Sequence, residues 1–121
     1  MTFWRVSGLT KILLMKFLDE MYQAAEESAP GEMCGLVIRQ NNTEKWILCQ
    51  NISEDKNDFE IDPKVFVQYQ LTSKILYVVH SHYNQKNLKA SIYDVNNCNA
   101  VNIPYLIVGY PQKEYIIIEP K

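Results

Sequence analysis

The run KILYVVH, residues 74–80, constrains the fold of this chain more than any other segment. Its side chains are mostly apolar and several are β-branched or aromatic, a composition typical of a strand that is buried on both faces. Such a strand lies in the interior of a sheet and requires other elements to cover each face. We therefore expect an α/β fold in which one mixed β-sheet is flanked by helices.

The remaining segments supply helices and strands for that sheet. Apolar residues recur at helical spacing between residues 10 and 28 and would line one face: Leu14, Phe17 or Leu18, Met21 and Ala25. Thr10 is the expected N-cap of this helix, and Pro30-Gly31 is a stop signal. The expected helices span residues 10–28, 62–71 and 91–101, and the expected strands span residues 33–39, 45–50, 59–61, 74–80, 104–110 and 113–119.

Length and composition indicate one soluble globular domain over residues 1–121, with 47% apolar and 21% charged residues. A net charge of -2 gives no reason to expect nucleic acid as a partner. No apolar run is long enough to cross a membrane, so we expect no membrane partner and folding in a cytoplasm. The three cysteines include no CxxC pair, which argues against a disulfide framework and a zinc finger.

Both histidines of the chain, His80 and His82, stand at the end of the expected 74–80 strand. Residues i and i+2 of an extended segment point to the same side, so the two imidazoles can reach one point. Asp94, in the first turn of the next helix, can be folded back to that point. Two imidazoles and one carboxylate are the ligand count of a catalytic zinc site, which leaves the fourth position for water. Ser91 is close enough to Asp94 to donate to an oxyanion.

Each of these residues also has a purely structural interpretation. The histidine pair alone could be two surface residues, and S-x-x-D from Ser91 to Asp94 is a variant of the capping box. Capping is compatible with metal binding, because a capped first turn would present Asp94. Cys34 has no histidine left to act as its base, so we expect a buried strand residue, and we expect Cys98 to be a buried helix residue.

Glu32 in GEMCGLVI, the HSH of residues 80–82 and the S-x-x-D of residues 91–94 together resemble the JAMM motif of the MPN/JAB metalloprotease superfamily. The resemblance implies a JAB/MPN fold with a cytidine-deaminase-like layout and a Zn²⁺ cofactor. It also implies His80, His82 and Asp94 as the zinc ligands. Glu32 would then be the general base, and Ser91 would support the oxyanion.

Four segments are similar to the branch of phage tail assembly proteins of the lambda K type: residues 24–38, 49–63, 77–98 and 103–120. This implies a metallopeptidase or isopeptidase of tail assembly, whose partners are a protein substrate or tail-assembly proteins. It would work in the host cytoplasm during assembly or in the virion tail. We expect a stand-alone JAMM domain, because the chain leaves no room for the cysteine peptidase domain that often follows in that branch.

Two other functions stay open at this point. One is a non-catalytic structural subunit of the tail tip with a residual metal site. The other is a cellular JAMM enzyme that cleaves ubiquitin-like or sulfur-carrier conjugates. The sequence does not indicate the oligomeric state.

The loop after His82 departs from the motif. Tyr83 stands where the family usually has proline, and Ala90 stands where proline often precedes the serine. The segment from Tyr83 to Ala90, which separates His82 from Ser91, is also one residue longer than usual in the family. Because proline restricts the backbone, we expect this loop to be less restrained than in the family. All five polar positions of the motif are occupied, so we expect the site to bind metal.

Overall fold

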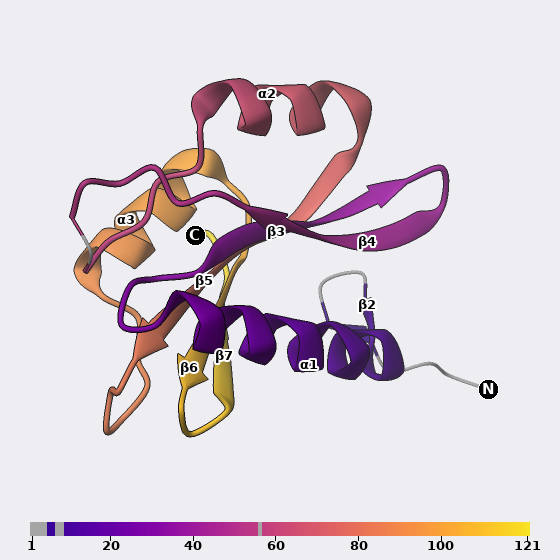
Figure 1. The fold of residues 1–121 in the computed structure, drawn as a ribbon. Coiled ribbons are helices and arrows are strands. Elements are labelled where there is room, and N and C mark those ends of the chain that lie inside the picture. Colours follow the sequence, from indigo (N-terminus) through magenta and orange to yellow (C-terminus); the bar gives the residue numbers. More distant parts are fainter. Residues whose placement is uncertain (1–4, 7–8, 56) are drawn as a thin grey trace.

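The computed structural model describes residues 5–6, 9–55 and 57–121. Figure 1 shows helices and strands built around a single main sheet. In chain order the elements are β1 (Arg5–Val6), β2 (Leu9–Thr10), α1 (Lys11–Ser28), β3 (Cys34–Gln40), β4 (Thr43–Cys49), α2 (Pro63–Thr72), β5 (Lys74–Tyr83), α3 (Ile92–Val101), β6 (Tyr105–Tyr110) and β7 (Glu114–Ile118). No helix in the described part of the chain is both long and apolar enough to span a membrane.

The segment that contains KILYVVH forms β5, the central strand of the five-stranded sheet, whose order is β4-β3-β5-β6-β7. β5 pairs antiparallel with β3 and parallel with β6, so the sheet is mixed, as predicted. The parallel pair needs a crossover connection, and that connection contains α3. β1 and β2 form a separate two-stranded sheet that the sequence did not predict.

Helix α1 lies along one face of the sheet, called the α1 face below (Figure 1). This face buries a large apolar cluster. The cluster contains Leu14, Phe17, Leu18, Met21, Ala24 and Ala25 of α1, and Met33, Val37, Leu76, Tyr77, Val79, Leu106 and Val108 from the sheet and its approach. The predicted apolar face of this helix is confirmed, and Phe17 and Leu18 are both part of it. The side chain of Thr10, the predicted N-cap, lies outside the described residues.

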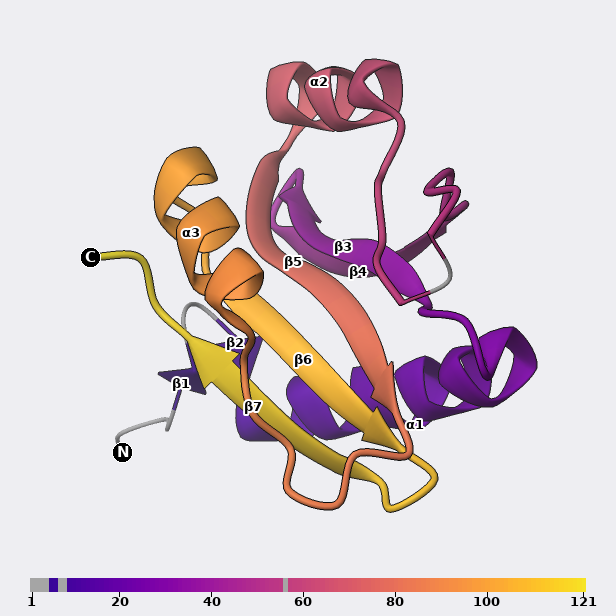
Figure 2. The ribbon, with the colours of Figure 1, turned by 90° about the vertical axis from the view of Figure 1, so that its left-hand side faces the viewer.

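Figure 2 shows α2 and α3 on the opposite side of the sheet, called the α2/α3 face below. Its buried apolar cluster is smaller: Leu36, Ile38, Ile75, Val78, Cys98 and Tyr105. No residue of α2 is buried, whereas six residues of α1 are. The α2/α3 face is therefore only partly covered by apolar contacts, and its remaining buried positions are available for polar residues.

Two predictions about local structure are wrong. Residues 59–61 do not form a strand, because the backbone of Glu60 is bonded within its own loop. Asn51 Oδ1 accepts the N–H of Glu60 at 3.0 Å, and the N–H of Ile52 donates to the Glu60 carbonyl at 2.9 Å. β5 also runs to Tyr83, beyond the predicted end at His80, so His82 lies inside the strand.

Candidate metal centre

His80 and His82 lie on the α2/α3 face of β5, with ring centroids 5.1 Å apart. They share that face because alternate residues of a strand point to the same side. His80 is completely buried and His82 is 8% exposed. The central position of β5 thus places both imidazoles beneath the surface, where a ligand would be shielded from bulk water.

His80 is surrounded by aromatic rings. Phe59 stacks on it with centroids 4.3 Å apart, and Tyr105 meets it edge-on at 5.8 Å. Burial lowers the pKa of His80, which keeps the imidazole neutral, the form that binds metals. Neither ring nitrogen has a hydrogen-bond partner of good geometry, although Nε2 lies 3.0 Å from Asp94 Oδ1. Buried polar atoms are almost always satisfied, so this orphaned ring fits a site that takes a cation.

Asp94 lies in the first turn of α3, between the two imidazoles. Its Oδ1 is 3.0 Å from His80 Nε2 and its Oδ2 is 3.3 Å from His82 Nε2. Burial by itself would raise the pKa of Asp94. The two histidines and the N–H of Ser91 outweigh that effect and lower the pKa well below its usual range, so the carboxylate is ionised.

Ser91 is the N-cap of α3, and the predicted capping box is present. Ser91 Oγ accepts the N–H of Asp94 at 3.1 Å, and the N–H of Ser91 donates to Asp94 Oδ2 at 2.9 Å. These two bonds hold Asp94 in place. The hydroxyl hydrogen of Ser91 takes part in neither bond, and the exposed side chain lines the cavity described below, so it can donate to a ligand there.

Glu32 joins the histidines through the pairing of β3 with β5. Cys34 pairs with His80 in that register, and the N–H of Ser81 donates to the carbonyl of Met33 at 3.0 Å. Continuing the register places Glu32 opposite His82. The nearest ligand atoms of Glu32, His80 and His82 all lie within 4.8 Å of one another, which is close enough for one metal ion.

Two residues that hold the segment around Glu32 were not predicted from the sequence. Ser81 points away from its neighbouring histidines to the α1 face, where its Oγ accepts the buried N–H of Met33 at 2.8 Å. Asn51 donates from Nδ2 to the Glu32 carbonyl at 3.0 Å. Strand alternation could have indicated the direction of Ser81, but nothing in the sequence marks Asn51.

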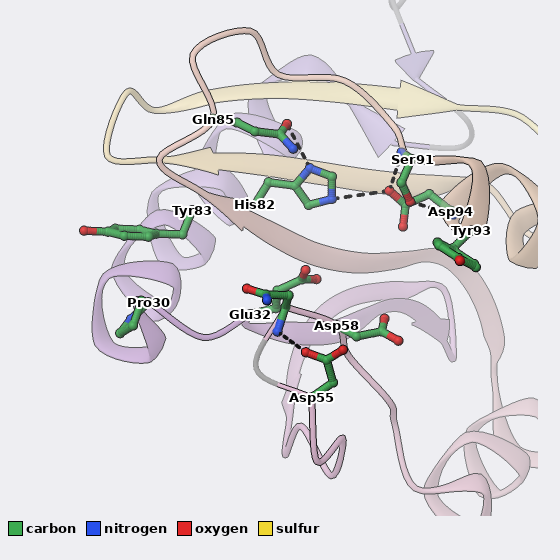
Figure 3. A pocket seen from close by; sticks show the side chains of 11 residues that line it. Pro30, Glu32, Asp55, Asp58, His82, Tyr83, Gln85, Ser91, Tyr93 and Asp94 are labelled. Atoms are coloured by element: carbon green, nitrogen blue, oxygen red, sulfur yellow. Dashed lines mark hydrogen bonds and ion pairs between the residues drawn. The ribbon is translucent and has the colours of Figure 1, made fainter.

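The site opens into a cavity of about 670 Å³. Its lining residues are Pro30, Glu32, Asp55, Asn57, Asp58, His82, Tyr83, Gln85, Ser91, Tyr93 and Asp94. Figure 3 shows Glu32 facing His82 and Asp94 across this cavity, with Asp55 and Asp58 on the side of Glu32. Four of the five predicted site residues thus line the cavity, and the fully buried His80 lies behind them.

Burial raises the pKa of Glu32 to about 8, against an attraction from His82 that lowers it. Asp94 adds to the rise because two carboxylates close together cannot both ionise at low cost. Burial also acts to lower the pKa of His82, but contacts with Asp94 and Gln85 outweigh it, and the net direction is upward. A carboxyl group with a pKa near neutrality is suited to general acid–base chemistry.

The structure brings all five predicted site residues to one place. Four of them carry metal-ligand atoms, and these are two imidazole nitrogens and two carboxylates, a donor set that suits zinc. His80 and His82 can combine with either Asp94 or Glu32 to complete a set of three protein ligands. The assignment of ligand and base between those two carboxylates therefore stays a prediction.

The two buried cysteines have structural environments, as predicted. Cys34 is 1% exposed on β3, and burial raises the pKa of its thiol to about 12. Cys98 is 1% exposed on α3, and its Sγ approaches the carbonyl of Ile103 at 3.3 Å. Both thiols are protonated at neutral pH, which does not suit a nucleophile.

This combination of fold and site defines a class. Residues 15–117 match the family model described as prokaryotic homologs of the JAB domain. Because the match covers most of the chain, the chain belongs to that family.

Two particular proteins resemble it. The chain is 25% identical over 107 residues to the tail tip assembly protein K of Escherichia phage N15, a match that covers 88% of this chain and 44% of that protein. It thus spans less than half the length of the curated relative that it matches. The crystal structure of a JAB1/MPN domain protein from Archaeoglobus fulgidus matches with a TM-score of 0.58 and 18% identity, over 84% of this chain and 82% of the other. The structural match supports the predicted JAB/MPN fold.

Proposed function

We propose that this chain is a zinc-dependent peptidase or isopeptidase of the JAMM type that acts on a protein of phage tail assembly. The observation that carries the proposal is the convergence of two buried imidazoles and two carboxylates beside one open cavity. Family membership supports the type of chemistry, and the similarity to a tail tip assembly protein supports the setting.

In this proposal His80, His82 and Asp94 hold the metal. Asp94 is the better third ligand because its two oxygens lie at 3.0 and 3.3 Å from the two histidine Nε2 atoms, and because α3 holds it rigidly. A zinc ion there would polarise a substrate carbonyl and lower the pKa of water. Glu32 faces the same point from the opposite wall of the cavity and is left free for proton transfer.

The residues of the chain then divide the hydrolysis of an amide bond. Glu32 accepts a proton from the attacking water, whose oxygen bonds to the carbonyl carbon. Ser91 Oγ donates a hydrogen bond to the oxyanion that develops on the carbonyl oxygen. Glu32 then returns the proton to the nitrogen as the C–N bond breaks, which releases an acid and an amine. A cation beside Glu32 favours its ionised form, which prepares it to accept that proton.

Metal content tests the ligand assignment. We expect purified protein to hold about one zinc per chain by elemental analysis, and we expect His80→Ala and Asp94→Ala to lose it. Glu32→Gln should keep the metal. The matched control is Asp58→Asn, which alters another carboxylate of the same cavity and should also keep it. Wild-type protein without metal, or Glu32→Gln protein that loses it while Asp94→Ala keeps it, would overturn this assignment.

A second candidate function is a structural subunit of the tail tip whose metal site does no chemistry. The observation that favours it is the loop after His82, which lacks the prolines of the motif. Deletion of the gene from its own genome, followed by complementation, separates the two. If Glu32→Gln protein retains zinc and restores wild-type numbers of tails in electron micrographs, the structural function holds. If it retains zinc and restores none, the peptidase proposal holds.

A further inference from the structure

The loop between β5 and α3, which departs from the family motif, is held by specific hydrogen bonds. Asn84 has a positive φ of 57°, and its N–H donates to the carbonyl of Tyr110 at 2.7 Å. The next residue, Gln85, turns its side chain back toward the metal centre. Its Oε1 lies 3.1 Å from His82 Nδ1, as Figure 3 shows.

The orientation of the Gln85 amide follows from a second bond. The backbone N–H of Lys89 donates to the same Oε1 at 3.3 Å. A backbone N–H can only donate, so the atom facing it is the amide oxygen and not the amide nitrogen. That oxygen can only accept, so His82 Nδ1 donates this bond, and Nε2 is the ring nitrogen that faces Asp94 and the candidate metal position.

Gln85 is itself held by the turn between β6 and β7. Gln112 Nε2 donates to the carbonyl of Gln85 at 2.6 Å. Gly109, the register partner of His82 on β6, leaves space for this contact. A Cβ at position 109 would lie 3.0 Å from Gln112 Nε2 and 3.2 Å from Leu88 Cδ2. The β6–β7 turn thus holds the backbone of Gln85, while Lys89 holds its side-chain amide.

We infer that Gln85 is a positioning residue for His82, held in place by Gln112. Its oxygen fixes the proton on Nδ1 and the direction of the ring, so that Nε2 is presented to the metal. This link restrains the loop that lacks the prolines of the motif. The inference rests on the proposed function, because it assumes that His82 Nε2 is a ligand.

Zinc affinity, measured by competition with a chelator, is the first test. Loss of a residue that orients a metal-bound histidine costs about 10–100-fold in metal affinity, and we expect Gln85→Ala to weaken zinc binding by that factor. Gln85→Glu keeps an acceptor oxygen and should restore most of the affinity. Gln112→Ala should have a smaller effect than Gln85→Ala. The matched control is Gln68→Ala on the exposed surface of α2, which should bind zinc as the wild type does.

Nitrogen NMR of the His82 ring is the second test, and it needs no metal and no activity. In metal-free wild-type protein, at a pH where both ring nitrogens of His82 are protonated, we expect the Nδ1–H that donates to Gln85 to exchange slowly with water. In Gln85→Ala this exchange should become faster, while the spectrum of His80 and the fold remain unchanged.

The results separate this inference from the proposed function. If the wild type binds no zinc, the proposed function fails, and the NMR pattern alone decides the role of Gln85. If zinc binds but Gln85→Ala matches the wild type within twofold, the inference is overturned and the proposed function stands. A His82 Nδ1–H that exchanges equally fast in metal-free wild type and in Gln85→Ala also overturns it.

Discussion

The α1 face and the α2/α3 face of the sheet differ in how they use buried positions. The α1 face is filled by one apolar cluster to which α1 contributes six buried residues. On the α2/α3 face the apolar cluster is smaller, and the buried polar positions beside it are His80, His82 and Asp94. Neighbouring residues of β5 therefore have different roles: Val79 packs in the apolar core, whereas His80 is part of the candidate site. Substitutions on the two faces should separate stability from metal binding.

The largest effect on stability is expected on the α1 face. Met21 is completely buried in α1, and Met21→Ala should cost about 2–5 kcal/mol of unfolding free energy in urea, because it removes apolar contacts and leaves a cavity. Zinc bound per folded chain should not change. The control is Gln23→Ala on the exposed side of the same helix. A cost below about 1 kcal/mol would contradict tight apolar packing of the α1 face.

Ser81 lies between the two site histidines in β5, and its hydroxyl bonds the backbone next to Glu32. Ser81→Ala leaves the buried N–H of Met33 without an acceptor, which should cost about 1–3 kcal/mol of unfolding free energy. Because the same bond positions the segment that carries Glu32, peptidase activity should fall more than zinc content does. Ser28→Ala, an exposed change at the end of α1, is the control. Equal loss of zinc and of activity would mean that Ser81 acts on the histidines instead.

Glu32 should lower the stability of the metal-free protein, whereas the buried residues of the α1 face raise it. Its folded pKa is about 8 and its ordinary value is 4.5. Below about pH 4.5 the carboxyl is protonated in both the folded and the unfolded chain, and it does not oppose folding. As the pH rises toward about 8, only the unfolded chain ionises freely, so the folded state loses stability. At pH 8, Glu32→Gln should therefore melt a few degrees above the wild type. This corresponds to a gain of about 1 kcal/mol in unfolding free energy after allowance for solvent screening.

The pH dependence is the control for that measurement. The difference between Glu32→Gln and wild type should shrink as the pH falls toward 5, where the carboxyl is protonated in the folded chain. Glu27→Gln, at an exposed position of α1, should show no such trend. Equal melting temperatures at pH 8 would contradict the buried environment of Glu32.

The smallest effect concerns the thiols. Burial raises the pKa of Cys34 to about 12, so at pH 8 its thiolate fraction is far below that of an ordinary cysteine. We expect iodoacetamide to label the half-buried Cys49 before Cys34 or Cys98, as read by peptide mass spectrometry. Rapid labelling of Cys34 in the folded protein would indicate an open α2/α3 face. Labelling of all three in urea confirms that the reagent is competent.

The parts of the structure that were predictable depend on local pattern. KILYVVH gave the central strand, alternation placed His80 and His82 on one side, and the S-x-x-D spacing gave the capped turn that holds Asp94. The position of Glu32 relative to the histidines depends on the register between β3 and β5. That register pairs residues that are far apart in the chain, such as Met33 and Ser81, which are 48 positions apart. Only the family resemblance therefore linked Glu32 to the site.

Other features required side-chain geometry that no sequence pattern encodes. Residues 59–61 have the composition of a strand, but the backbone N–H and carbonyl of Glu60 bond to Asn51 and Ile52 within the same loop. The loop after His82 was expected to be less restrained because it lacks proline. Instead, Gln85 and Gln112 restrain it through contacts between segments that are far apart in the chain.

The bond between Ser81 and Met33 has a consequence for the order of events during folding. His80, His82 and Asp94 are close in sequence, so a short loop brings them together at low entropic cost. Glu32 reaches them only when β3 closes a much longer loop onto β5, and long-range pairings of this kind form slowly. A folding chain would thus bring the two histidines and Asp94 together before Glu32 joins them, so under the proposed function the site is completed only when β3 has paired with β5.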